Sequence, residues 1–197
     1  GGVGSGKSTV ASMLSESGIP VIDTDAVAHE LLSYPGGETV IEITARFGNE
    51  AVAEDGTIDR PGMAARVFAD DALRSALEAI LHPAIGRVVE ERIEKLSLTA
   101  DTVVIEVPLL FEAGWDRFVD AVVVVDCSPE QQVARFVERT GATEVEARRR
   151  MSSQMTRAAR NHRADFILNN GGSLSDLKEA VELLLPKLRK VGGDNVC

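Results

Sequence analysis

The first nine residues, GGVGSGKST (residues 1–9), fit the pattern G-x-x-x-x-G-K-[ST] at every fixed position, which is typical of a phosphate-binding loop. Glycines let the backbone turn its N–H groups inward around an anion without the strain that a side chain would add. In this chemistry Lys7 reaches the β- and γ-phosphates of a nucleotide, and the Ser8 hydroxyl is a ligand of Mg²⁺. We therefore predict that nucleotide phosphates are bound by Gly2, Val3, Gly4, Ser5, Gly6, Lys7, Ser8 and Thr9.

An apolar helical face follows the loop directly. Val10, Met13 and Leu14 recur at helical spacing, so the phosphates would lie at a helix N-terminus, where backbone N–H groups favour anions. The alternative, a flexible glycine linker, does not require Lys-Ser followed at once by an amphipathic helix. The pattern also expects a hydrophobic strand before the first glycine, which here is residue 1. From this we expect that the natural chain begins further upstream with a buried strand.

The composition indicates a cytoplasmic protein with one substantial core, built as one domain with insertions or as two small domains. A net charge of −10 over 197 residues argues against a nucleic-acid-binding surface. No apolar run approaches the roughly 20 residues of a membrane span. Cys127 and Cys197 are the two cysteines, too few for a disulfide framework or a zinc site, which suits a reducing cytoplasm.

Arginines gather in the segment 135–163. It holds eight of the chain's 16 arginines and three glutamates, and a local cationic patch in an acidic protein favours small polyanionic ligands. The alternative is a solvated helix face. Arg135 and Arg139 are four residues apart on one helix face, and Thr140-Gly141 follows as a turn or hinge. We interpret residues 135–163 as an arginine-rich lid.

Two carboxylates, Asp23 and Asp25, follow the short apolar run 19–22, which predicts a buried strand. In open α/β sheets ligands bind beyond the carboxyl ends of strands, so we expect both carboxylates to face the phosphate loop. Alternatively, Asp25 is the N-cap of a helix that begins near Ala26. The two roles are compatible, because a capping residue can also meet a substrate.

Helix and strand patterns alternate along the rest of the chain and predict an α/β fold with a mainly parallel sheet. Residues 29–98 show helical periodicity with several breaks, one of them at His82-Pro83, where Pro83 would begin a new helix. We interpret residues 29–100 as a helical substrate subdomain. Strands are expected at 102–106, 122–125 and 166–168, and a helix at 174–188. The nucleotide-binding core then comprises residues 1–28, 101–134 and 164–197.

A series of motifs in this order resembles the dephospho-coenzyme A kinases, a family of small-molecule kinases with a phosphate loop (P-loop). After the loop come Asp23-Thr24-Asp25, Leu81-His82-Pro83, VPLLFE (107–112), Gln154 and ADF (164–166), followed by Asn170-Gly171. The resemblance extends from Gly1 to about Gly172, and these later motifs are far more specific than the loop. It implies a P-loop kinase fold with a mainly parallel five-stranded sheet flanked by helices, of which the first strand is absent from residues 1–197, plus a substrate subdomain and a lid.

The resemblance also implies an activity: transfer of the γ-phosphoryl group of ATP, with Mg²⁺, to the 3′-hydroxyl of the ribose of dephospho-coenzyme A. Asp25 would orient or deprotonate that hydroxyl, and Asp23 would hold a metal-bound water. The family's acidic residue before Val-Pro is expected to be Asp, whereas this chain has Glu106, so we assign Glu106 no metal. From the loop pattern, the helical spacing of the arginines and the resemblance together, we expect the following roles. The expected catalytic residues are Asp25, Lys7, Arg139 and Arg135; the expected substrate contacts are Asp25, His82, Leu109, Phe111, Glu112 and Arg157; the expected metal ligands are Ser8 and Asp23.

Plainer interpretations stand beside these roles. His82 before a proline is also typical of a helix break, Phe111 and Glu112 fit core and surface positions, and Asn170 either borders the adenine or is a turn residue before Gly171. Another small-molecule kinase, for a nucleoside monophosphate or a sugar acid, would share the loop and the lid and differ in the substrate subdomain. A regulatory switch such as a GTPase is disfavoured, because the sequence contains no Asn-Lys-x-Asp motif.

Overall fold

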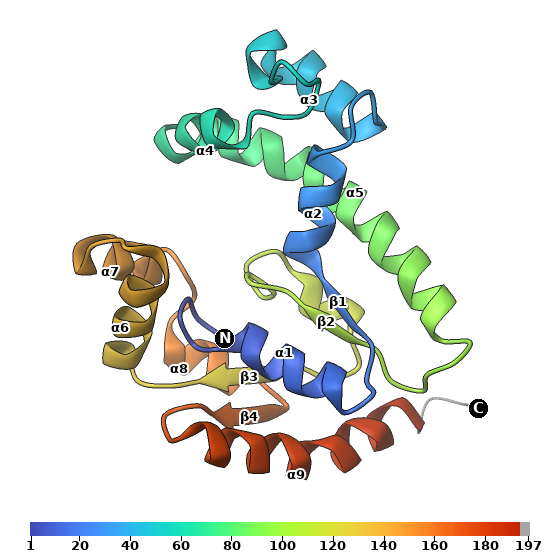
Figure 1. Ribbon diagram of the computed structural model, residues 1–197, viewed down its shortest axis with the longest axis vertical. Helices are drawn as coiled ribbons and strands as arrows, with labels where there is room; N and C mark the ends of the chain where they lie inside the picture. Colours follow the sequence, from blue (N-terminus) through green and yellow to red (C-terminus); the bar gives the residue numbers. More distant parts are fainter. Residues whose placement is uncertain (194–197) are drawn as a thin grey trace. The chain divides into compact units, whose positions relative to one another are not determined.

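The computed structural model describes residues 1–193, which divide into two compact units (Figure 1). The first, here called the core unit, contains residues 1–22 and the chain from Leu96 onward. The second, here called the helical unit, contains Asp23–Lys95. In the part of the chain that the structure describes, no helix has the length and hydrophobicity needed to cross a membrane.

The core unit contains short strands at or within two residues of the predicted positions. They are β1 (Val21–Asp23), whose last residue already belongs to the helical unit, β2 (Val104–Glu106), β3 (Val123–Asp126) and β4 (Phe166–Asn169). β1 pairs with β2, and β3 pairs with β4 in parallel, from Val123 opposite Phe166 to Asp126 opposite Asn169. Within residues 1–193 the strands are three or four residues long and pair two by two, so the continuous five-stranded sheet that we expected is not seen.

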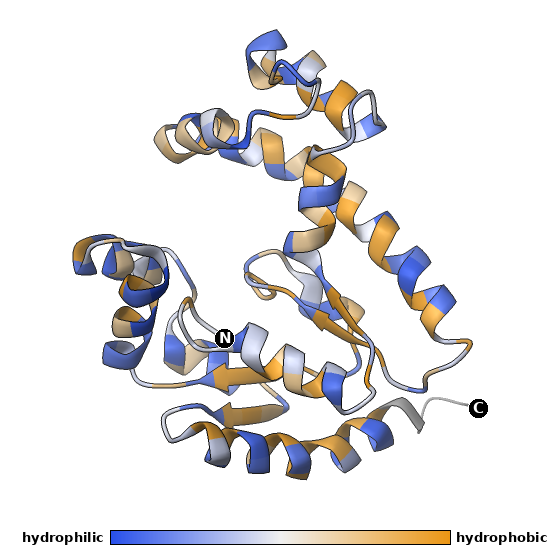
Figure 2. Cartoon of the chain, viewed as in Figure 1, coloured by the Kyte–Doolittle hydropathy of each residue, from blue (hydrophilic) through white to orange (hydrophobic). Residues whose placement is uncertain are grey.

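Helices α1 (Lys7–Glu16) and α9 (Leu174–Gly193) cover the strands of the core unit. Figure 2 shows the strands as largely hydrophobic and α9 as a striped, amphipathic helix. Burying each large aliphatic side chain contributes about 1.5–3 kcal/mol relative to leaving it exposed. The shared core consists of Val10, Leu14, Ile19, Val125, Leu168, Leu177, Val181, Leu184 and Leu188.

Between β3 and β4 the chain forms three helices, α6 (Pro129–Thr140), α7 (Glu144–Ser152) and α8 (Arg157–His162). Ser128 and Gln131 cap the start of α6 reciprocally, and Gly141, with φ 69°, ends it. Val133 and Phe136 of α6 pack against Ala147 of α7. The start that we predicted for the lid, residue 135, therefore falls inside α6.

The helical unit is built from α2 (Thr24–Leu32), α3 (Glu38–Phe47), α4 (Arg60–Ala69) and most of α5 (Asp71–Leu96), with a 3₁₀ turn at Asn49–Ala51. Its core is separate from that of the core unit. It consists of Val40, Ile43, Phe47, Ala51, Ile58 and Met63, with Leu73, Leu77, Ile80 and Leu81 of α5 packed against them.

The predicted helix break at His82-Pro83 is wrong, because α5 runs without interruption from Asp71 to Leu96 and contains Pro83. A proline inside a helix removes one backbone hydrogen bond and crowds the preceding turn. Here apolar side chains hold the helix on both sides of it: Leu77 and Ile80 pack before Pro83, and Ile85 and Val89 are buried after it. Tertiary packing therefore overrides the local breaking signal.

Candidate active site

The glycine-rich loop turns tightly before α1. Gly4 and Gly6 have φ values of 70° and 93°, in the left-handed region that favours glycine. The Lys7 ammonium donates to the Gly2 carbonyl at 3.3 Å. A Cβ atom at position 4 would lie 2.3 Å from the backbone carbonyl oxygen of Gln132. Glycine is therefore required at position 4 twice over, by the backbone conformation and by the closeness of another chain segment.

Three amide side chains from distant segments fix the loop backbone. Gln132 donates to the Val3 carbonyl at 2.8 Å, Gln154 accepts from the Val3 N–H at 2.9 Å, and Asn170 donates to the Ser5 carbonyl at 2.7 Å. Our sequence analysis assigned no role to Gln132. The signal that could have found it is its position beside the apolar Val133 on α6. A polar side chain that is buried with such a residue requires a hydrogen-bond partner.

The Ser8 hydroxyl meets a carboxylate at the end of β2. Its Oγ donates to Oε1 of Glu106 at 2.9 Å. Hydroxyl and carboxylate oxygens are ligands that Mg²⁺ accepts, usually together with phosphate oxygens and water. Residues 1–193 contain no group of three or more His, Cys, Asp or Glu that could hold a metal ion by themselves. The Ser8 hydroxyl and the Glu106 carboxylate are oxygen donors of the kind that Mg²⁺ accepts.

A charged pair lies at the carboxyl end of β3. Arg157 of α8 binds Asp126 with both Nε and Nη2, at 2.7 to 3.0 Å. Hydrogen bonding to the Arg157 guanidinium holds the pKa of Asp126 below its usual value, and Asn161 adds to this effect. The Arg157 side chain is 48% exposed. The arginine that we expected to contact substrate is thus also engaged in the core unit itself.

Arg160 lies beside the loop and is 8% exposed. Its Nη1 donates to the Met155 carbonyl at 3.0 Å, and a Cβ atom at Gly2 would come within 3.0 Å of its Nη2. Burial lowers the pKa of its guanidinium. Among the described residues, neither its Nε nor the buried Oγ of Ser5 has a hydrogen-bond partner.

The two arginines of α6 differ in their surroundings. Arg135 is half-buried beside the thiol of Cys127, and its buried Nη1 has no hydrogen-bond partner among the described residues. Burial raises the pKa of the Cys127 thiol. Arg139, one helical turn later, is exposed to solvent. The predicted common helix face thus presents one guanidinium to the interior of the core unit and the other to solvent.

The VPLLFE segment, residues 107–112, divides between core and surface. The Phe111 ring is 8% exposed and packs with Val122 and Val124, and the Arg163 guanidinium lies 4.4 Å from its centre. The packing favours the core interpretation of Phe111. Leu109 is 42% exposed, and Glu112 accepts a hydrogen bond from the Met155 N–H at 2.7 Å.

The helical unit carries the remaining predicted residues. Asp23, in extended conformation, is the N-cap of α2, and its Oδ1 accepts from the N–H groups of Asp25 and Ala26 at 2.8 and 3.3 Å. The alternative interpretation, that Asp25 is the N-cap of a helix beginning near Ala26, is therefore wrong, because α2 begins at Thr24 and Asp25 is already helical. Asp25 is exposed in the first turn, where the helix dipole favours a negative charge. His82 is exposed in the middle of α5.

A glycine loop that closes onto a helix N-terminus, beside the carboxyl ends of the strands of an α/β unit, defines a P-loop nucleotide-binding protein. Residues 1–176 match the family described as dephospho-CoA kinase. The chain belongs to the dephospho-CoA kinase family.

Two curated relatives, both named dephospho-CoA kinase, are similar over almost their whole length. The protein of Thiobacillus denitrificans is 45% identical over 185 residues, which is 93% of this chain and 90% of that protein. That of Corynebacterium glutamicum is 40% identical over 189 residues, 95% of this chain and 96% of that protein. A crystal structure from Thermus thermophilus is 37% identical in sequence and superposes with a TM-score of 0.81. The superposition covers 95% of this chain and 94% of the chain in that structure.

Proposed function

We propose that this protein transfers the γ-phosphoryl group of ATP to the 3′-hydroxyl of the ribose of dephospho-coenzyme A, giving coenzyme A and ADP, the last step of coenzyme A synthesis. The observation that carries the proposal is the family match over residues 1–176. No contact in the described residues favours a nucleoside monophosphate or a sugar acid as the acceptor instead.

The core unit supplies the ATP site. The backbone N–H groups of Gly2 to Thr9 and the Lys7 ammonium bind the phosphates, since the loop backbone is fixed by its side-chain braces before any ligand arrives. The partnerless polar atoms of Ser5 and Arg160 beside the loop support an anion site there. Asn170 would border the adenine through its amide oxygen, because its amide nitrogen donates to the Ser5 carbonyl.

Ser8 is the protein ligand that we propose for Mg²⁺, with Glu106 orienting the hydroxyl or the waters around the ion. When bound there with ATP, Mg²⁺ would supply positive charge against the negative charge that develops on the β- and γ-phosphates. The 2.9 Å hydrogen bond between Ser8 and Glu106 supports this assignment and gives Glu106 a role that we did not assign to it from the sequence. Asp23 would act on the metal through a water, since its Oδ1 already caps α2.

The helical unit, together with a lid at residues 135–163, is our proposal for the acceptor side. Phosphoryl transfer through a loose transition state requires positioning and charge stabilisation more than covalent chemistry. Asp25 therefore orients the 3′-hydroxyl and accepts its proton as the bond to phosphorus forms. Exposed Arg139 is better placed to approach the transferring phosphoryl group than half-buried Arg135. His82, Leu109, Glu112 and Arg157 complete the proposed acceptor contacts.

Two further assignments follow from the family. We propose that the β1–β2 and β3–β4 pairs belong to the five-stranded sheet of a P-loop kinase. We also propose that the protein acts in the cytoplasm, on dephospho-coenzyme A and ATP, without a nucleic-acid or membrane partner. The net charge of −10 supports the exclusion of nucleic acid.

Coupled ATP turnover tests the acceptor and Asp25 together. Dephospho-coenzyme A is compared with nucleoside monophosphates and gluconate, using the wild type, Asp25→Asn and the matched control Glu42→Gln, an exposed carboxylate on α3. We expect turnover with dephospho-coenzyme A, lowered roughly 10²- to 10⁴-fold in Asp25→Asn because the group that handles the proton is lost, with the KM for ATP and the control unchanged. Turnover with another acceptor, or a fully active Asp25→Asn, contradicts the proposal.

A further inference from the structure

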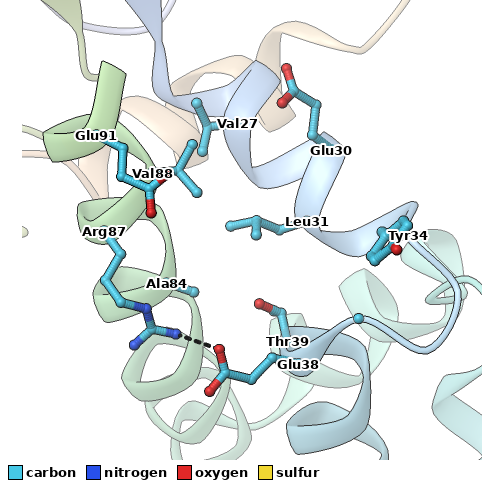
Figure 3. Close-up of a pocket in the computed structure, with 11 residues that line it drawn as sticks. Val27, Glu30, Leu31, Tyr34, Glu38, Thr39, Ala84, Arg87, Val88 and Glu91 are labelled. Atoms are coloured by element: carbon cyan, nitrogen blue, oxygen red, sulfur yellow. Dashed lines mark hydrogen bonds and ion pairs between the residues drawn. The ribbon is translucent and has the colours of Figure 1, made fainter. Parts of the chain in front are cut away.

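A pocket in the helical unit and the side chain of Val3 in the core unit both lie outside the chemistry assigned so far. The pocket, of about 460 Å³, is formed by α2, the start of α3 and α5 (Figure 3). Among its described lining residues the one cation, Arg87, is paired with Glu38 at 3.3 Å, and none of them has a role in the proposed reaction. Val3, in contrast, belongs to the loop that binds phosphates, so its contacts bear directly on that reaction.

Val3 is held through its N–H, its carbonyl and its side chain at once. Its N–H donates to Oε1 of Gln154 at 2.9 Å, and its carbonyl accepts from Nε2 of Gln132 at 2.8 Å. Gln132 belongs to α6, and Gln154 follows the last residue of α7 by two positions. The Val3 side chain packs against an apolar cluster whose other described members all lie in α6, in α7 and in the turn between them: Val133, Phe136, Val137, Ala142, Ala147 and Met151.

The loop backbone also lies directly against the backbone of α6. A Cβ atom at Gly4 would be 2.3 Å from the carbonyl oxygen of Gln132 and 3.2 Å from its Cα atom. Valine has a stiff β-branched side chain, and a close-packed interior transmits a displacement from one group to the next. The pair of helices at residues 129–152, here called the α6–α7 hairpin, therefore cannot shift relative to the loop without disturbing Val3.

Arg139 lies on the helix that Val3 contacts. It follows Phe136, a member of the Val3 cluster, by three residues on α6, which is about 4.5 Å along the helix axis. The Arg139 side chain is exposed and does not belong to the cluster. Because α6 is one continuous helix, its position against Val3 nevertheless sets the position from which Arg139 extends.

We infer that Val3 is a positioning residue, which seats the phosphate loop against the α6–α7 hairpin and thereby places Arg139 for the transferring phosphoryl group; this rests on the proposed function. In the ground state, ATP is held by the loop N–H groups and Lys7, whereas an arginine of this kind acts on charge that develops during transfer. Interactions that are stronger in the transition state raise kcat. The Val3 side chain therefore supports kcat more than it supports affinity for ATP.

The test compares Val3→Ala with the matched control Val137→Ala. Val137 is half-buried like Val3 and packs in the same cluster, but it belongs to α6 itself. Turnover of dephospho-coenzyme A gives kcat, and isothermal titration calorimetry with Mg²⁺ and ATP, without an acceptor, gives the Kd. In Val3→Ala we expect kcat to fall roughly 10- to 100-fold and the Kd for ATP to rise less than about three-fold. Val137→Ala should keep most of kcat, as should Val3→Ile, which retains an apolar β-branched side chain.

A double-mutant cycle with Arg139→Ala tests whether Val3 acts through this arginine. If it does, adding Val3→Ala to Arg139→Ala should lower kcat by less than about two-fold, because the interaction that Val3 positions is already lost. Independent, multiplying losses in the double variant overturn the inference, as does an Arg139→Ala variant with the activity of the wild type. Equal losses in Val3→Ala and Val137→Ala, or a loss confined to ATP affinity, overturn it as well.

Amide hydrogen exchange, followed by NMR in the ligand-free protein, tests the seating of the loop without turnover. The amide of residue 3 donates to Gln154, so we expect its protection factor to fall about ten-fold or more in Val3→Ala and to stay unchanged in Val137→Ala. An unchanged protection factor in Val3→Ala refutes the seating alone. A wild type that fails to phosphorylate dephospho-coenzyme A refutes the proposed function, and the exchange measurement then still decides whether Val3 seats the loop.

Discussion

The phosphate loop of the core unit and the first turn of α2 in the helical unit differ in the hydrogen bonds that fix their backbones: those of the loop are long-range, and those of α2 are local. The loop is bonded by Gln132, Gln154 and Asn170, which lie 129 to 165 residues from their partners. The first turn of α2 is fixed by Asp23, through N–H groups two and three residues away. The loop geometry depends on the whole core unit, whereas the helix start depends on one local side chain. Replacing the groups that hold the backbone should therefore disturb activity at the loop, and mainly local stability at the Asp23 cap of α2.

Gly4→Ala is the change that should break the loop most completely. The new Cβ would meet the Gln132 carbonyl oxygen at 2.3 Å, and backbone cannot move aside cheaply. We expect kcat/KM for ATP to fall roughly 100-fold or more, because small displacements of positioning groups cost that much. Gly18→Ala is the matched control: Gly18 also has a positive φ of 83° but open space around it, so it should cost about 1–2 kcal/mol of stability and leave activity intact. Equal activity of the two variants would show that crowding is unimportant.

Asp126→Asn should measure how much the charged pair of Asp126 and Arg157 contributes to the stability of the core unit. The folded pKa of Asp126 is lowered, so its contribution is present above the unfolded pKa of about 3.9 and is lost as pH falls through the lower folded value. Since Arg157 is half exposed, we expect a loss of about 1–2 kcal/mol at pH 7, which shrinks below about pH 4.

Urea unfolding at several pH values measures this effect. The exposed control Glu78→Gln removes the 3.9 Å contact to Arg74 in the helical unit and should change stability by about 0.5 kcal/mol or less. If the free energy of unfolding changed with pH in the same way in the wild type and in Asp126→Asn, the charge of Asp126 would contribute nothing to stability.

Asp23→Ala is expected to have the smallest effect on stability. It tests whether the first turn of α2 depends on this one local side chain. Removing the N-cap should cost about 1 kcal/mol in thermal unfolding, and Asp23→Asn should restore most of it, because asparagine caps equally well. If Asp23 also holds a metal-bound water, Asp23→Asn will keep the stability and raise the Mg²⁺ concentration needed for turnover. If Asp23→Asn is as unstable as Asp23→Ala, the cap is not the source of the effect.

Features that depend on a few adjacent residues were predictable from the sequence. The loop, the strands at or within two residues of their positions and the helical character of residues 29–98 follow from motif, β-branched runs and periodicity. Features that depend on distant partners were not. Nothing near Gln132 shows that its amide reaches Val3, and nothing near Glu106 shows that it meets Ser8.

Pro83 and Asp23 illustrate two further reasons for error. Proline disfavours a helix interior, so the sequence predicted a break at Pro83. Apolar packing on both sides of the proline keeps α5 continuous. The capping alternative named Asp25, but the N-cap is Asp23, because the capping residue is the one that keeps an extended backbone as the strand ends.

The long-range bracing of the loop has a consequence for the order in which the protein forms during synthesis. Ribosomes release a chain from its N-terminus, so the loop emerges long before Asn170, which lies 165 residues behind the Ser5 carbonyl that it holds. Contacts of such separation form slowly and late. The nucleotide site therefore matures only when β4 has joined β3, and tight ATP binding by a nascent chain would report that almost the whole core unit has folded.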